Sequence, residues 1–126
     1  MKPIQKWLAT TLRLWIVLIP CISLAHHSHG NYLRTDWILL DGTVTERHWM
    51  NPHSWLYLEV VNADGQPIVW ALEGASVTTL RRGGWTRDSV EVGDEISVRC
   101  HPLKDGSKGC LLGYITTAAG VEKEFD

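Results

Sequence analysis

Two strand-like stretches joined by an Asp-Gly turn constrain the fold of this chain more than any other feature. Across 54–61, apolar residues occupy every second position from Leu56 onward, which is the period of a half-buried β-strand. Asp64 and Gly65 both tolerate the left-handed backbone conformation of a tight turn. A second strand-like stretch follows at 67–73. The sequence therefore predicts a β-hairpin in this part of the chain.

The rest of the chain reads as further short strands around one short helix. Gly42 predicts a bulge or a bend in the first strand, and Ser76 is a candidate N-cap. The predicted elements are strands at 37–49, 54–61, 67–73, 95–101 and 110–117 and a helix at 75–82, before a polar tail that adds a short strand or frays. This order predicts an all-β fold, a small five-stranded OB-like Greek-key barrel with one short helix between strands 3 and 4. A small β-sandwich is the alternative, and neither fold by itself gives a function.

The first 25 residues have the pattern of a signal peptide. Lys2, Lys6 and Arg13 make a basic start, the eleven residues 14–24 carry no charge, and small residues stand at positions 23 and 25. The apolar run is short for a membrane span, and an uncleaved anchor is the alternative. We expect a signal peptide at 1–25, a His-rich mature N-terminus at 26–36 and a barrel domain at 37–126. The expected location is periplasmic or secreted, with no stable membrane insertion after cleavage.

Charge argues against nucleic acid as a partner. The signal peptide removes three of twelve basic residues, which leaves nine against fourteen acidic ones and a net charge near −5. A surface of this sign repels a phosphate backbone.

Two cysteines remain in the mature chain and predict a disulfide. Cys100 and Cys110 flank Asp105-Gly106, a strong hairpin signal, and residue 105 is their midpoint. We expect them to face each other across the hairpin and to stabilise the fold by roughly 2–3 kcal/mol. A thiolate metal site or a redox pair is the alternative, but the C-x-x-C spacing of redox motifs is missing.

Histidines gather in two short segments and predict a metal site. Five of the six histidines are His26, His27, His29, His48 and His53. If the signal is cut after Ala25, His26 offers both its α-amine and its ring nitrogen, a donor set that suits divalent copper. His27 or His29, with His53 or His48 from the barrel, would complete the site, and Met50 would offer a soft ligand for reduced copper. We therefore expect a transition-metal site, with copper favoured.

Interpretations of these histidines that involve no specific metal site stay open. Adjacent histidines in a loose terminus bind metal weakly in almost any protein, and His53 after Asn51-Pro52 can cap a turn through a backbone hydrogen bond. Cleavage after Ser23 instead gives Leu24-Ala25-His26, an amine-x-His pattern that binds copper through backbone nitrogens. Either cleavage therefore gives some affinity for copper without a built site.

A second group combines an aromatic side chain with basic ones. Trp85 and Arg87, together with Arg81 and Arg82, form a candidate rim for a partner protein or a small anionic or planar ligand. The alternative function is therefore a non-enzymatic OB-type binding module. The structural interpretation is that Trp85 fills the barrel end while Arg87 pairs with Asp88.

Signatures of catalysis are sparse. The chain has no nucleophile-elbow serine, no glycine-rich phosphate loop and no H-E-x-x-H motif. We therefore expect that the protein is not an enzyme. A mononuclear copper oxidase or oxygenase is the one enzymatic alternative that stays open.

Several motifs together resemble a known family. They include His26-His27-Ser28, Asn51-Pro52-His53 with Trp55, Arg81-Arg82-Gly83, Gly84-Trp85-Thr86-Arg87-Asp88-Ser89 and Lys104-Asp105-Gly106-Ser107. In this combination the chain resembles an uncharacterised family of small exported bacterial proteins, known only as a domain of unknown function, over about residues 26–117. The resemblance implies a periplasmic all-β domain and brings no established activity. Relatives usually carry an aromatic residue where this chain has His29, and a single glycine where it has Gly83-Gly84.

Overall fold

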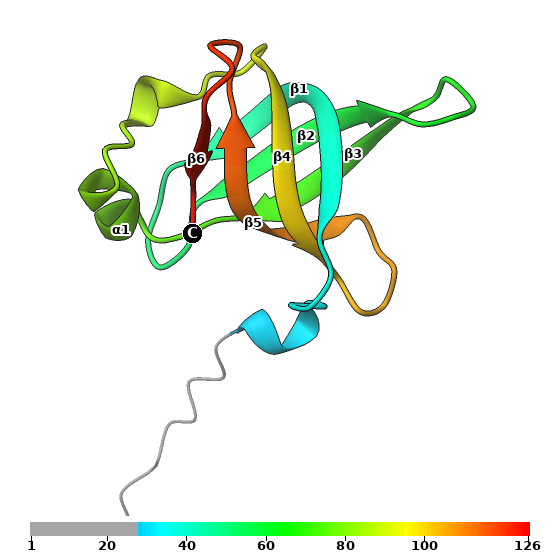
Figure 1. Cartoon of the computed structure of the whole chain (residues 1–126), viewed down its shortest axis with the longest axis horizontal. Helices are drawn as coiled ribbons and strands as arrows, with labels where there is room; N and C mark the ends of the chain where they lie inside the picture. Colours follow the sequence, from blue (N-terminus) through cyan, green and yellow to red (C-terminus); the bar gives the residue numbers. More distant parts are fainter. Residues whose placement is uncertain (1–27) are drawn as a thin grey trace, which may run out of the picture.

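Five strands curl into a closed barrel in the computed structural model, which describes residues 28–126 (Figure 1). The strands are β1 (Ile38–His48), β2 (Trp55–Val61), β3 (Pro67–Glu73), β4 (Glu95–Pro102) and β5 (Gly109–Thr116), with a short β6 (Glu122–Glu124) on the outer edge of β5. Antiparallel neighbours follow the order β3-β2-β1-β4-β5, and a parallel pairing of β3 with β5 closes the ring. The helix α1 (Val77–Arg82) lies between β3 and β4. The predicted OB-like barrel is confirmed.

β1 is long enough to belong to two strand pairs. From Ile38 to Thr43 it pairs with β4, and from Thr43 to its end it pairs with β2. A Cβ atom at Gly42 would lie 2.2 Å from the carbonyl oxygen of Glu59, so only glycine allows this close approach. The irregularity in the β1–β2 register falls between Val44 and Glu46, just beyond the glycine.

The core consists of residues that point into the barrel, as the alternation of 54–61 predicted for β2. Leu58, Leu72 and Val98 are fully buried inside the barrel. Trp85 joins this core, because its ring packs edge-on against that of buried Phe125 at 4.9 Å between centroids. A tail residue thus completes the core, which raises the buried apolar area of a small domain.

Two side chains cap the start of α1. The Ser76 hydroxyl accepts a hydrogen bond from the amide of Thr79 at 3.1 Å, as the sequence predicts for an N-cap. Asn51 in the β1–β2 loop accepts another from the amide of Val77 at 2.9 Å. The helix begins at Val77 rather than at residue 75, because the Ser76 backbone is extended. Among residues 28–126, no helix is long and apolar enough to cross a membrane.

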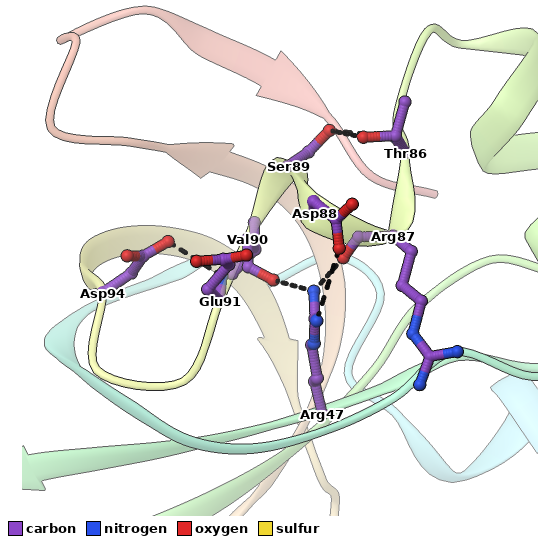
Figure 2. A network of polar contacts seen from close by, with 8 residues as sticks. All are labelled: Arg47, Thr86, Arg87, Asp88, Ser89, Val90, Glu91 and Asp94. Carbon is purple, nitrogen blue, oxygen red and sulfur yellow. Dashed lines mark hydrogen bonds and ion pairs between the residues drawn. The ribbon is translucent and has the colours of Figure 1, made fainter.

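Arg47 holds the loop that follows α1 (Figure 2). Its guanidinium donates to the carbonyl oxygens of Arg87 and Val90, the latter at 2.8 Å, and lies 3.6 Å from the Asp88 carboxylate. The loop contains a short 3₁₀ helix, η2 (Arg87–Ser89). The expected pairing of Arg87 with Asp88 is wrong, because Arg47 reaches Asp88 from β1.

A disulfide joins Cys100 of β4 to Cys110 of β5. The strand register places Cys110 opposite Pro102 and Cys100 opposite Leu112, so the cysteines are diagonal neighbours rather than directly opposite. Both are fully buried. The bond therefore ties the two strands together next to the β4–β5 loop.

Candidate metal centre

Three potential metal ligands from distant parts of the sequence converge on the outer face of the barrel. His29 lies in a short 3₁₀ helix, η1 (Ser28–Asn31), His53 in the β1–β2 loop, and Glu73 at the end of β3. One ligand atom from each lies within 4.8 Å of the ligand atoms of the other two. The His29 and His53 rings meet edge-on, with 5.9 Å between their centroids.

Glu73 is the most unusual member of this group, because its side chain is buried. The residue is 3% exposed, and a buried carboxylate is costly unless it is paired or hydrogen-bonded. The Tyr32 hydroxyl donates to its Oε2 at 2.6 Å, and His53 Nδ1 lies 3.2 Å from its Oε1. Both carboxylate oxygens are therefore engaged by neighbouring side chains.

Strand register explains why Glu73 points to the outside of the barrel. It lies directly opposite Trp55 in β2 and opposite Leu111 in β5, whereas Leu72 beside it points into the core. Alternation along a strand sends neighbours to opposite faces. Glu73 would be open to solvent if another segment did not cover it.

The N-terminal strap, which we define as residues 28–36, provides this cover. Lys104 in the β4–β5 loop donates from its amide to the Asn31 carbonyl at 2.9 Å and from its Nζ to the Gly30 carbonyl at 2.7 Å. The amide of Leu33 donates to the Pro102 carbonyl at 2.9 Å. These bonds hold the backbone that immediately follows His29 against the hairpin.

His53 is held by its neighbours on both sides in the sequence. Asn51 caps α1, as described above, and its bond to Pro52 is a cis peptide. Buried Ser54 donates to the Ala75 carbonyl from its amide at 3.0 Å and from its hydroxyl at 2.8 Å. The loop therefore presents the imidazole from a fixed backbone.

Burial changes the acidity of the tyrosine that contacts Glu73. Desolvation raises the pKa of Tyr32 far above its ordinary value, and the hydrogen bond to Glu73 and the charge of its carboxylate add to this effect. Tyr32 therefore stays protonated and donates to Glu73 throughout the physiological pH range.

An open pocket of about 420 Å³ adjoins two of the three ligands, His53 and Glu73. His53, Glu73 and Tyr32 form one side, and Asn31, Met50, Pro52 and Trp55 form the rest. The pocket lies beside the β2–β3 face and the β1–β2 loop, the region where OB folds bind their ligands. Two imidazoles and a carboxylate next to an open space match the protein ligands of a catalytic-type zinc site, which leaves one coordination position free.

The structure brings together two of the five predicted metal ligands, His29 and His53. His48 lies elsewhere, where it contacts Glu46 and its ring lies 5.5 Å from that of Tyr57. His26 and His27 lie outside the described residues. The sequence analysis missed Glu73 and Tyr32. A hairpin centred on residue 64 places position 73 opposite position 55, so the register contained a signal for Glu73.

The four residues of the candidate ligand rim differ in burial, because Trp85 is buried and the three arginines are exposed. Trp85 is 4% exposed, and its Nε1 donates to the Glu124 carbonyl. Its ring therefore offers no free face to a planar ligand. Arg81, Arg82 and Arg87 are exposed, and a partner-binding role for them stays a prediction.

The chain matches a known protein family. Residues 15–112 match a family described as a family of unknown function, DUF6152. No curated protein matches the chain. The match covers most of the sequence, including His29, His53 and Glu73, and it confirms the resemblance to a domain of unknown function. The chain therefore belongs to the family of unknown function DUF6152.

Proposed function

We propose that this barrel binds one divalent transition-metal ion through His29, His53 and Glu73. The observation that carries the proposal is the convergence of two imidazoles and one buried carboxylate, with ligand atoms within 4.8 Å of one another. Imidazole and carboxylate together suit zinc and copper. A bound cation would also offset the cost of burying the Glu73 charge.

Copper is the ion that we favour. For a given set of nitrogen and oxygen ligands, divalent copper binds more tightly than the other first-row ions, zinc included. Zinc, which tolerates a tetrahedral His₂Glu set, is the competing ion. Titration with each ion distinguishes a copper site from a zinc site.

We place this activity outside the cytosol, in the periplasm or in a secreted form. Support comes from the signal-peptide pattern of residues 1–25 and from the disulfide, a bond that persists mainly in oxidising compartments. The proposed role is the binding or handling of a metal ion.

The proposal is tested by calorimetric titration of the protein with Cu²⁺ and Zn²⁺, after its N-terminus has been determined by mass spectrometry. We expect one tight site per chain, with copper bound more tightly than zinc. Replacing a ligand with His53→Ala should weaken binding about tenfold or more, since even outer-shell changes cost 10–100-fold. The matched control is His48→Ala, which removes an exposed histidine from outside the group.

Circular dichroism must first show that both variants keep the fold. If His53→Ala and His29→Ala bind copper as tightly as the wild type, the three-residue site is wrong. Binding would then belong to the terminal histidines or to no built site.

A further inference from the structure

The pocket beside His53 and Glu73 has walls unlike those expected for a site that binds only a metal ion. His53, Glu73 and Tyr32 line its metal-facing side. Beyond them stand Met50, which is 48% exposed, and the exposed Pro52 and half-buried Trp55. The far side of the pocket is therefore largely apolar and aromatic.

The number of ligands leaves the ion with a position to fill. His29, His53 and Glu73 supply three donors, whereas zinc and copper take four or more. In three-ligand sites the remaining position goes to water or to an external ligand. Because His53 and Glu73 both line the pocket, the free position is expected to face into it.

Size and charge narrow the class of external ligand. At about 420 Å³ the pocket is far larger than a water molecule and falls in the range of small-molecule sites. No lysine or arginine lines it, so no cationic side chain there would hold the second oxygen of a carboxylate or a phosphate. Its neutral polar groups are the Asn31 amide and the Tyr32 hydroxyl, and the hydroxyl already donates to Glu73. A neutral donor on a flat apolar body fits these walls best.

We propose that the metal ion and this pocket together bind a small, flat nitrogen heterocycle of the azole type. One ring nitrogen fills the free coordination position, and the apolar body lies against Trp55 and Met50. This inference rests on the proposed function, because the ion anchors the ligand. It assigns the pocket a binding role of its own, with Trp55 as a residue that sets specificity.

The experiment compares imidazole with 4-phenylimidazole on the Cu²⁺-loaded protein, with binding followed by the visible absorption of copper. Both probes offer the same nitrogen donor, and only one carries an aryl group to fill the pocket. We expect 4-phenylimidazole to bind about tenfold more tightly, or better, because it buries an additional ring. Trp55→Ala and Met50→Ala should each reduce this preference, and the Cu²⁺ affinity of each variant is measured so that the two probes are compared at full copper loading.

Val61→Ala is the matched control, because it removes an exposed apolar side chain from the opposite end of β2. It should change neither the copper affinity nor the preference for the aryl probe. Met50→Ala keeps the test decisive if Trp55→Ala does not fold, since Met50 is exposed in a loop.

Three outcomes would overturn the inference, and they are distinguishable. If copper binds but the two probes bind equally or not at all, the pocket has no binding role and the metal site stands. If the probes bind only after Met50→Ala, the thioether itself fills the fourth position. If no copper binds, the proposed function fails as well.

Discussion

Glu73 carries its carboxylate on the outer face of a barrel strand, yet it is almost fully buried. Its two oxygens contact Tyr32 and His53, so it can ligate an ion directly or orient His53 toward one. In either role its negative charge matters as much as its shape. A substitution that keeps the shape and removes the charge therefore separates metal binding from folding.

We expect Glu73→Gln to weaken Cu²⁺ binding about tenfold or more. The metal-free variant should unfold at the same urea concentration as the wild type or at a higher one, because a buried charge no longer has to be desolvated. Calorimetry and urea denaturation measure the two effects separately. A large loss of metal-free stability with unchanged copper affinity would make Glu73 a structural residue only.

Tyr32 should make the stability of the metal-free protein depend on pH. Its pKa is raised in the folded protein, mainly by burial, so the folded state keeps the proton after the unfolded chain has lost it. Stability linked to Tyr32 is thus complete below the ordinary tyrosine pKa of about 10 and falls as the pH rises above it. In chelator-treated samples, the wild type should lose stability above pH 10 more steeply than Tyr32→Phe. Parallel curves would show that Tyr32 keeps an ordinary pKa.

Individual strands and helices were predictable where a local sequence pattern is enough to determine them. The alternation at Leu56, Leu58 and Val60 gave β2, and the Ser76 hydroxyl gave the start of α1 to within two residues. The contact of Arg47 with the η2 loop was not predictable, because 43 residues separate Arg47 from Val90 and no local pattern links them. Only the closed barrel brings β1 under that loop.

Arg47→Met should destabilise the protein by about 1–3 kcal/mol, because the carbonyls of Arg87 and Val90 lose their donor. Arg87→Met removes an exposed guanidinium from the same loop and should change stability by about 0.5 kcal/mol or less. Urea denaturation gives the free energies, and amide exchange at Ser89 reports loosening of the loop. Equal effects of the two variants would mean that the Arg47 contacts add nothing.

At the scale of the whole molecule, the candidate metal site exists only because the barrel closes and the N-terminal strap crosses it. A histidine-rich start and an Asn-Pro-His loop were visible in the sequence, and they predicted His29 and His53. Glu73 was not predicted, because a charged residue on the outer face of a strand usually faces water. Its burial depends on Tyr32, 41 residues earlier in the chain.

The disulfide links this architecture to the metal site. It joins the strands of the hairpin that holds the strap through Lys104. The double variant Cys100→Ala/Cys110→Ala should therefore lower both the stability of the fold and the affinity for metal. We expect a loss of roughly 2–3 kcal/mol in the free energy of unfolding, from the greater freedom of the unfolded chain. Metal affinity should fall by less than it does on removal of His53. Thermal denaturation and calorimetry check these effects, and an unchanged melting temperature would contradict the first of them.

Anomalous diffraction from crystals grown with Cu²⁺, and separately with Zn²⁺, would locate a bound ion in the protein. We expect one strong peak bounded by His29, His53 and Glu73, with copper displacing zinc when both are present. A peak that involves His26 or His27 without His53 and Glu73, or no ordered peak, would contradict a metal site built into the barrel.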